Sequence, residues 1–311
     1  MNPLVSIICL CHNHSRFIRE ALNSVINQTY NNIEMIIVDD ASTDNSAKII
    51  SEYIHKNQFL PIKQNIGNCA AFNMGLSLAK GEFVIDFATD DVLVKERVAL
   101  QVEAFKKLDK SYGVVFTDAV YIDEHSEFLG YHYNRINNEV QSGDVYKEIL
   151  ERYFICPPTM MIRKQVLDDL GGYDEQLAYE DFDFWVRSAR SYKYYYLDKA
   201  LTYRRIVSNS HSVKFTNAGD DRMIRSTYLV CNKAFKLNRN EIENKALAKR
   251  VRYEMRQAFF TENFDLSRDF ARLLKKINYL DWFHRIIELL SKINIRVSRL
   301  HSWYYRLKYG K

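Results

Sequence analysis

Three short apolar runs, each ending in polar or acidic residues, constrain the fold of this 311-residue chain most strongly. They occupy residues 5–11, 33–40 and 82–91, and each has the length and the β-branched content of a buried strand. Segments with apolar residues at helical spacing lie between and after them. This alternation predicts an α/β domain built on a Rossmann-like, doubly wound and mostly parallel sheet.

Pairs of carboxylates close two of these runs. Asp39 and Asp40 end the second run, and Asp90 and Asp91 end the third. Because right-handed crossovers bring the carboxyl ends of parallel strands to the same edge of a sheet, we expect both pairs to face one ligand cleft. Asp44, further along, is typical of a helix start, where a side-chain oxygen accepts from free backbone N–H groups.

The two pairs suit different ligand groups. A carboxylate such as Asp40 can accept from an N–H on a nucleotide base. Asp90 and Asp91 offer adjacent hard oxygen ligands, which Mn²⁺ or Mg²⁺ accepts when water and phosphate complete the shell. A diphosphate leaving group would need such a cation to neutralise its developing charge. The alternative is that each pair is a solvated strand end.

The cysteine content and the N-terminus bear on localisation. The chain has five cysteines, an odd number with no CxxC spacing, so neither a disulfide framework nor a zinc site is predicted. No basic segment followed by an apolar stretch opens the sequence, and no window approaches eighteen apolar residues. We therefore expect a cytoplasmic protein that is neither exported nor membrane-spanning.

The charge is divided unevenly along the chain. Residues 215–311 carry 21 Lys and Arg against 10 Asp and Glu, whereas residues 1–214 carry 23 against 29. This division predicts two regions with different partners, one over 1–214 and a basic α-helical C-terminal region over 215–311. A nucleic-acid partner is not expected, because residues 1–214 are net negative.

An amphipathic helix is predicted from Trp282 onward. Its apolar stripe recurs every three or four positions, at Phe283, Ile286, Leu290, Ile293, Val297 and Leu300. Its basic face lies about 120° around the helix from the centre of this stripe, at Arg285, Lys292, Arg296 and Arg299. Basic residues with interfacial aromatics favour binding to an anionic membrane surface, peripherally and on its inner face. The alternative is docking on the catalytic domain or on a second subunit, as in a homo-oligomer.

Four ordered segments resemble the family 2 glycosyltransferases with the GT-A fold, and the resemblance covers residues 3 to 212. The segments read PLVSIICLCHN, REALNSVINQTYNNIEMIIVDDASTDNS, NIGNCAAFNMGLSLAKGEFVIDFATDD and MMIRKQVLDDLGGYDEQLAYEDFDFWVR. The resemblance implies an enzyme that transfers a sugar from a nucleotide diphosphate donor with inversion at the anomeric carbon. It also implies a catalytic domain over 1–214, with a nucleotide-sugar half at about 1–95 and an acceptor half at about 96–214.

The resemblance also implies roles for residues on the nucleotide side. Leu10, His12 and Asn13 of the first segment and Asp40 match the base-recognition positions, with Asp40 accepting from the uracil N3–H. His12 stands where family members often carry Tyr, and its imidazole could stack on the base. Asn73 is implied as a further nucleotide-binding residue, with Phe72 where the family often has Arg.

For the metal, the resemblance implies Asp91 as a direct ligand and Asp90 as a partner of the ribose or of a metal-bound water. Ala88 replaces the usual leading Asp of the motif. The downstream His of the family falls near Ile206, so His211 is the candidate metal ligand there, or else a solvated loop residue. Arg204 and Arg205 of the same stretch either neutralise the diphosphate or lie on the surface.

An inverting transfer needs one base to take the proton from the attacking hydroxyl. By family position this base is Asp181, with Glu180 and Asp183 as rivals. The alternative for each is a helix-start charge that only favours the helix dipole.

These inferences predict a metal-dependent hexosyl- or N-acetylhexosaminyltransferase that uses a UDP-sugar. Its acceptor would be a hydroxyl of a growing surface polysaccharide or oligosaccharide, with a lipid-linked acceptor as one option. A nucleotidyltransferase that makes a nucleotide sugar is one alternative, although residues 12–17 lack the glycines of its phosphate loop. A catalytically silent glycan- or nucleotide-binding protein is the other.

Overall fold

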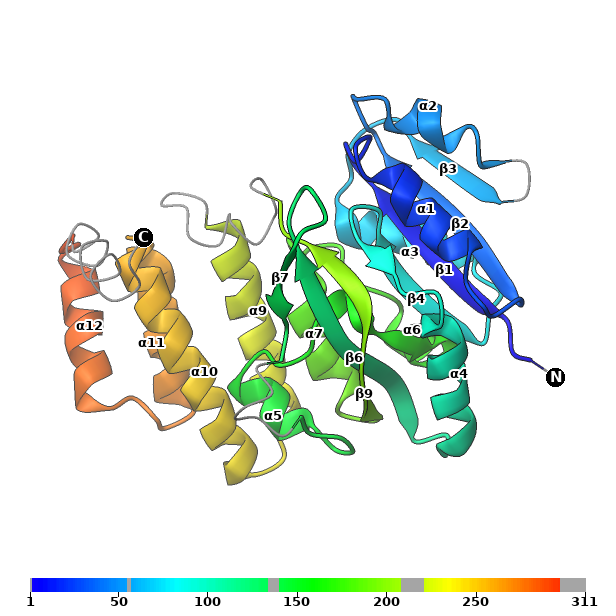
Figure 1. Cartoon of the computed structure of the whole chain (residues 1–311). Helices are drawn as coiled ribbons and strands as arrows, with labels where there is room; N and C mark the ends of the chain where they lie inside the picture. The colour runs from blue at the N-terminus through cyan, green and yellow to red at the C-terminus, as the bar shows by residue number, and fades with distance from the viewer. Residues whose placement is uncertain (1, 55–56, 134–139, 208–220, 297–311) are drawn as a thin grey trace. The chain divides into compact units, whose positions relative to one another are not determined.

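The computed structural model describes residues 2–54, 57–133, 140–207 and 221–296 (Figure 1). The chain divides into two compact units, one formed by Met1–Val145 and Phe154–Val207 and the other by Tyr146–Tyr153 and Ser208–Lys311. The predicted domain boundary at residue 214 lies outside the described residues. The proposed halves of the catalytic domain stay a prediction.

A mixed sheet, nine-stranded within the described residues, forms the centre of the first unit. Its strand order is β3-β2-β1-β4-β8-β6-β9-β5, and β7 pairs with the outer part of β6. The bounds are β1 Val5–Cys11, β2 Ile33–Asp40, β3 Gln58–Ile62, β4 Phe83–Ala88, β5 Val92–Leu93, β6 Tyr112–Ile122, β7 Phe128–Tyr131, β8 Met161–Arg163 and β9 Lys193–Arg205. The pairs β1–β2, β1–β4, β2–β3 and β6–β9 are parallel, and β8 and β5 pair antiparallel with their neighbours.

The strand register fixes where the acidic residues lie. Cys11 pairs with Asp39, and Leu10 pairs with both Val38 and Ala88, so β1, β2 and β4 end at the same edge. This confirms the prediction that the two carboxylate pairs follow strands that end side by side. Figure 1 shows these strands as adjacent arrows in the blue and cyan part of the chain.

Helices connect and cover the strands of the first unit. They are α1 Ile18–Ile26, α2 Ser46–Ile50, α3 Asn68–Leu78, α4 Arg97–Lys107, α6 Lys164–Leu170 and α7 Asp181–Ser188, with a 3₁₀ turn η2 at Pro157–Thr159. Helix α2 is shorter than its sequence pattern predicts, because the chain turns after Ile50. Gly171 ends α6 in the left-handed conformation with φ 69°, as the Gly-Gly pair predicts.

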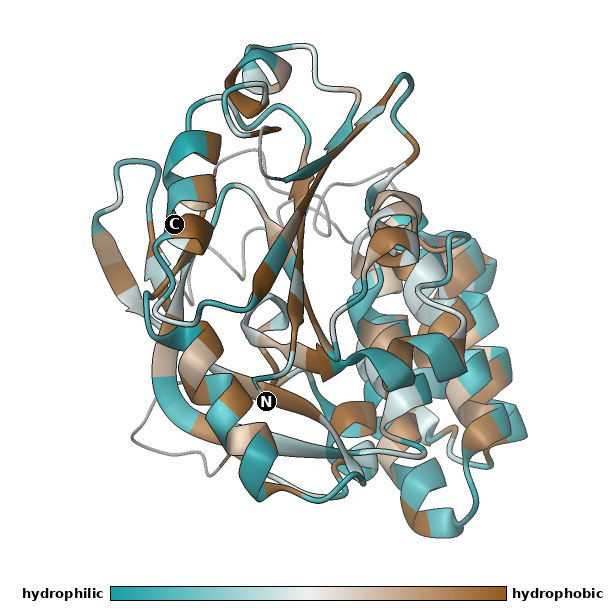
Figure 2. Cartoon of the chain, turned by 90° about the vertical axis from the view of Figure 1, so that its right-hand side faces the viewer, coloured by the Kyte–Doolittle hydropathy of each residue, from teal (hydrophilic) through white to brown (hydrophobic). Residues whose placement is uncertain are grey.

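The central strands bury apolar side chains on both faces. Ile7 and Cys9 of β1 and Ile85 and Phe87 of β4 belong to a buried apolar cluster that includes residues of α1 and α4. On the opposite face, Ile8 of β1 and Val38 of β2 are also fully buried and lie against Gly75 of α3. Figure 2 shows the strands as largely brown and the helices as banded brown and teal. Asp86, which is only partly buried, is therefore a polar exception within the sheet.

The second unit is α-helical in its described part, as predicted for the C-terminal region. It contains α5 Tyr146–Glu151, α9 Arg222–Leu237, α10 Glu241–Phe260, α11 Phe264–Lys276 and α12 Trp282–Lys292. Asn240 caps α10 by accepting from the Glu243 amide, and Asp281 caps α12 by accepting from the His284 amide. Within the described residues, no helix combines the length and the apolar character needed to cross a bilayer.

All five cysteines fall in the described part of the chain. Each is buried and none forms a disulfide, which agrees with the absence of a disulfide framework predicted from their number and spacing. Burial raises the pKa of the Cys156 thiol to about 12, so this thiol stays protonated at neutral pH.

Candidate active site

The end of β2 carries carboxylates that hold the surrounding loops. Asp40 accepts from two backbone N–H groups of the loop before α3, with Oδ1 to the Ile66 amide at 2.8 Å and Oδ2 to the Gly67 amide at 3.0 Å. Asp39 accepts from the Ser42 hydroxyl. Asp40 is 6% exposed. A base contact to Asp40 would therefore use the remaining lone pairs of an already hydrogen-bonded carboxylate.

The loop after β1 lies against the loop after β2. The His12 imidazole is exposed, and its Nδ1 lies 2.7 Å from the Asp40 carbonyl oxygen, to which it donates. Asn13, at φ 60°, accepts at Oδ1 from the Thr43 amide (2.7 Å) and donates its own amide to the Ser42 hydroxyl (2.9 Å). Asn13 Nδ2 and Asn65 Nδ2 also lie 3.2 Å from the ring nitrogens of His12, and the residue stays exposed, as a stacking role would require.

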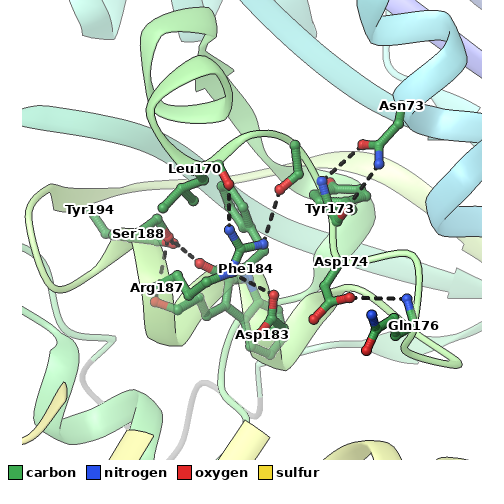
Figure 3. A network of polar contacts seen from close by, with 12 residues as sticks. Asn73, Leu170, Tyr173, Asp174, Gln176, Asp183, Phe184, Arg187, Ser188 and Tyr194 are labelled. Carbon is green, nitrogen blue, oxygen red and sulfur yellow. Dashed lines mark hydrogen bonds and ion pairs between the residues drawn. The ribbon is translucent and has the colours of Figure 1, made fainter. Parts of the chain in front are cut away.

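Two other predicted nucleotide residues are used by the fold itself. Leu10 is 7% exposed, and its carbonyl accepts from the Thr89 amide. The Asn73 side chain donates to the Tyr173 carbonyl and accepts from the Tyr173 amide, both at 2.9 Å, as Figure 3 shows. Because Asn73 Nδ2 also donates to Glu175 at 2.9 Å, this amide fastens α3 to the loop before α7.

Asp44 lies just before the first residue of α2, Ser46, and accepts from its amide, as its position in the sequence predicts. Its carboxylate accepts from the Ser46 amide at 2.8 Å and from the Ser15 amide at 2.9 Å. Burial opposes the charge, but these hydrogen bonds from Ser46 and Ser15 outweigh it and lower the pKa of Asp44 to about 2. Asp44 thereby ties the loop after β1 to the start of α2.

Asp91 follows β4 and is almost completely buried. Its Oδ1 accepts from the Arg205 amide of β9 at 2.8 Å, and the residue is 4% exposed. Burial, and then the charge of Asp90, raise the pKa of Asp91 to about 8. The positive charges of Arg204 and Arg97 act in the opposite direction without cancelling this rise.

The two arginines at the end of β9 play different parts. The Arg205 side chain is 1% exposed and pairs with Glu20 at 2.8 Å, while its Nε donates to the Asp90 carbonyl. It is therefore a structural residue, neither free for a diphosphate nor on the surface. Arg204 is half-buried, and its charge lowers the pKa of both Asp91 and Asp181. Arg204 is thus the cation near both carboxylates.

Asp181 is the first residue of α7 and has an unusual environment. Its buried Oδ1 has no hydrogen-bond partner among the described residues, although the Asp181 side chain interacts with that of Glu180. Burial raises the pKa of Asp181 well above the usual carboxyl range, and the charge of Glu180 adds to this. Asp86 of β4, whose pKa burial and Glu180 also raise, contributes a smaller effect. Tyr173 Oη donates to Asp86 at 3.2 Å.

Both rivals of Asp181 have hydrogen-bond partners of their own, and one of them, Glu180, also interacts with Asp181 itself. Asp183 is 1% exposed and accepts from Arg187 Nε at 2.6 Å, and Arg187 in turn donates to the Leu170 and Gly172 carbonyls (Figure 3). Glu180 accepts from Asn68 Nδ2 at 2.8 Å. Asp183 is therefore held in a structural ion pair, whereas Asp181 keeps an oxygen without a partner.

The described residues supply only part of a metal shell. Within 2–54, 57–133, 140–207 and 221–296, no group of three or more His, Cys, Asp or Glu side chains is arranged to hold a metal ion. His211 lies outside this set. Asp90 and Asp91 nevertheless fit a divalent cation chemically, because they are adjacent carboxylates, which are hard oxygen ligands, at the end of one strand.

The sequence motifs did not single out His14, Asp86 or Tyr173. Asp86 interrupts an apolar strand, which is a signal in itself, because a carboxylate in a buried strand needs a partner. The partner, Tyr173, lies 87 residues away in sequence. His14 contacts Thr89, 75 residues away. No local spacing could have connected these pairs.

Comparison with known proteins agrees with this geometry. The sequence model of a protein family, described as glycosyl transferase family 2, matches residues 6–171. An uncharacterized glycosyltransferase of Rickettsia typhi is 29% identical over 222 residues, which are 70% of this chain and 67% of that protein. The chondroitin synthase of Pasteurella multocida is 27% identical over 245 residues, 78% of this chain and 24% of the synthase.

Solved structures resemble the whole chain. S. aureus TarS 1–349 in complex with UDP-GlcNAc has a TM-score of 0.72 at 19% identity and covers 98% of this chain and 92% of its own. The mannosyltransferase PcManGT from Pyrobaculum calidifontis, in complex with GDP-Man and Mn²⁺, has a TM-score of 0.60 at 15% identity, with coverages of 100% and 89%. At these identities the likeness concerns the fold, and it confirms the predicted GT-A architecture.

Proposed function

The chain belongs to glycosyl transferase family 2, and we propose that it transfers a sugar from a UDP-sugar to a hydroxyl of a growing surface polysaccharide or oligosaccharide, with inversion at the anomeric carbon. The observation that carries this proposal is the register that ends β2 and β4 at one edge, within the residues that the family model matches. UDP-GlcNAc bound to TarS and GDP-Man bound to PcManGT support a nucleotide-sugar donor. A hexose or an N-acetylhexosamine is the sugar we propose.

On the acceptor side, we assign the general base to Asp181. The acceptor hydroxyl passes its proton to Asp181 while its oxygen attacks the anomeric carbon, and the bond from that carbon to the diphosphate breaks on the opposite face. The unpartnered Oδ1 supports this role, because it can accept that proton without losing an existing hydrogen bond. A base must first be deprotonated, so the raised pKa makes the rate rise with pH.

On the donor side, we assign recognition of the nucleotide base to Asp40 and to the loop that contains His12 and Asn13. The exposed ring of His12, held by the Asp40 carbonyl, supports stacking on the base. Leu10 shapes this loop from its buried position. Asn73 acts through Tyr173, by fixing the segment that leads to Asp181.

A divalent cation, Mn²⁺ or Mg²⁺, completes the proposal. Asp91 would hold it directly, and Asp90 would contact the ribose or a water bound to the cation. When bound, the cation would neutralise charge that develops on the diphosphate leaving group. Arg204, near both Asp91 and Asp181, would add a fixed positive charge for the same leaving group.

The C-terminal unit offers a surface for an anionic membrane. Helix α12 buries His284, Ile287, Glu288 and Ser291, and it exposes apolar side chains at the opposite positions, with Trp282 at 74%, Leu289 at 59% and Ile293 at 61%. Basic side chains border the exposed row at Arg285 and Lys292. An apolar row flanked by positive charge matches the apolar interior and anionic headgroups of a lipid surface, so we propose peripheral attachment through α12.

The membrane proposal is tested by substituting Ser for Ile286, Leu289 and Ile293 together. We expect loss of flotation with phosphatidylglycerol vesicles, while Ile242→Ser, an exposed apolar residue of α10, floats normally. Equal flotation of the triple variant would contradict attachment. Loss of a dimer, rather than of vesicle binding, would instead identify a second copy as the occupant.

The transfer itself is tested by proton NMR of the product. Incubation with a UDP-sugar, Mn²⁺ and a glycan acceptor should give a new linkage whose anomeric configuration is opposite to that of the donor. A product with the same anomeric configuration as the donor would contradict an inverting transfer with Asp181 as its single general base. Asp91→Ala should abolish metal-stimulated hydrolysis of the donor, and an unchanged metal response would remove Asp91 as the ligand.

A further inference from the structure

His14 occupies the loop between β1 and α1 and faces the end of β4. Its Nδ1 lies 2.9 Å from the Thr89 hydroxyl, and its Nε2 lies 4.0 Å from Asp90 Oδ2. The side chains of His14 and Asp90 are 24% and 19% exposed, so both are half-buried at the edge of the sheet and still reach solvent. His14 has no role in the transfer proposed so far.

The Thr89 hydroxyl holds the His14 ring at Nδ1. Thr89 is completely buried, and its hydroxyl also lies 3.0 Å from the Leu10 carbonyl, which accepts from the Thr89 amide as well. When the hydroxyl donates to the Leu10 carbonyl, its oxygen accepts from His14 Nδ1. In that tautomer of the neutral imidazole, Nε2 presents a lone pair toward Asp90.

Two electron-pair donors thus face each other at the edge where the donor diphosphate is proposed to lie. Among the described residues, Asp90 forms its ion pair with His14, and its charge also acts on the neighbouring Asp91. Two atoms that each lie about 2.1 Å from a cation are about 3.0 Å apart when they are adjacent ligands and about 4.2 Å apart when they are opposite ligands. The observed 4.0 Å would therefore suit His14 and Asp90 on nearly opposite sides of a cation.

We propose that His14 Nε2 is a direct ligand of the divalent cation and that Asp90, in this arrangement, contacts the cation itself rather than a water bound to it. Thr89 acts as the positioning residue, because its hydrogen bond orients the ring. The cation would thus be held from two loops of the sheet edge, the one after β1 and the one after β4. This inference rests on the proposed metal-dependent transfer and adds a ligand that the acidic motif does not contain.

Electron paramagnetic resonance of Mn²⁺ in the presence of UDP tests this directly, with no need for turnover. The wild-type complex should show electron spin-echo modulation from a directly bound imidazole ¹⁴N. His14→Asn keeps an N–H for Thr89 but has no atom at the place of Nε2, so we expect it to lose the ¹⁴N signal and to bind Mn²⁺ at least about tenfold more weakly. His14→Gln, which places an amide oxygen there, should recover part of the affinity.

The matched control is His125→Gln, which changes an exposed imidazole of a surface turn and should leave signal and affinity unchanged. Circular dichroism confirms that each variant is folded. A wild-type complex that binds Mn²⁺ and UDP without ¹⁴N modulation, or a His14→Asn variant with normal affinity, would overturn the ligand assignment and leave the proposed transfer intact. A wild-type protein that binds neither Mn²⁺ nor UDP would overturn the proposed function as well.

Discussion

The carboxylates at the end of β2 and those at the end of β4 and the start of α7 are used in opposite ways. Asp40 and Asp44 each accept from two backbone amides, and the pKa of Asp44 falls to about 2. Asp91 and Asp181 are buried with fewer partners, and burial raises the pKa of both. The first group stabilises the loops at the edge of the sheet. The carboxylates of the second group have fewer hydrogen-bond donors around them, so a bound cation or a proton is needed to offset their negative charge.

The difference distinguishes carboxylates that stabilise the fold from carboxylates that are available for catalysis. A carboxylate that accepts two amide hydrogens is stabilised in its charged form, which makes it a poor base. A buried carboxylate beside other carboxylates holds its proton more tightly and is a better proton acceptor once ionised. Substitutions on each side of this division should therefore have different consequences.

The largest effect is expected for Asp181→Asn. Removing the general base should lower kcat by about 10²–10⁴-fold, while the affinity for the nucleotide donor is unchanged. Steady-state kinetics together with calorimetric titration of UDP measure both quantities. A variant with wild-type kcat would place Asp181 among the purely structural carboxylates.

Asp183→Ala should have the opposite effects, namely a loss of stability with little change in kcat. It breaks the buried pair with Arg187 and leaves that guanidinium uncompensated, at a cost of about 3 kcal/mol in the free energy of unfolding. Urea denaturation measures the loss. The kcat per folded molecule should stay within a few-fold of wild type, and a loss comparable to that of Asp181→Asn would make Asp183 the base.

Glu180→Gln sharpens the comparison through pH. The charge of Glu180 helps to raise the pKa of Asp181, so its removal should lower that pKa. Because the deprotonated base is the active form, the acidic limb of the kcat profile should move to lower pH. The Gln side chain can still accept from Asn68, which keeps the local hydrogen bond. An unmoved limb would show that another group controls the profile.

Asp44→Asn should give the smallest effect. The folded-state pKa lies below the ordinary value of 3.8, so the charged carboxylate stabilises the protein above that pH, and the contribution is lost as pH falls toward about 2. The residue is exposed, so we expect about 1 kcal/mol or less at pH 7. Thermal unfolding at pH 7 and at pH 2 checks this, and a difference that persists at pH 2 would contradict the electrostatic explanation.

Much of the fold could be predicted from local pattern. The apolar runs of β1, β2 and β4 and the Gly-Gly stop after α6 carry their structure in a few consecutive residues. The short strands β5 and β7 escaped prediction, because a two-residue and a four-residue strand depend on their pairing partners rather than on sequence periodicity.

The candidate site was predictable only where strand topology alone decides it. The shared edge of Asp40 and Asp91 follows from parallel strands, but the partners of each carboxylate do not. Nothing local in the sequence indicates that Asn73 binds the Tyr173 backbone, or that the Thr89 hydroxyl contacts the His14 ring. Such side-chain contacts join residues from distant segments, and only packing brings them together.

The central claim, a nucleotide-sugar site at this edge, is tested most directly by thermal shift with UDP-, GDP- and dTDP-sugars and Mn²⁺. A ligand at 100 times its Kd stabilises the folded state by about 2.7 kcal/mol, which for a domain of this size is a rise in Tm of about 5–10 °C. The account predicts such a rise for at least one UDP-sugar with the wild-type protein, and a much smaller one with Asp91→Ala. No rise with any of these nucleotides, or an equal rise with Asp91→Ala, would contradict it.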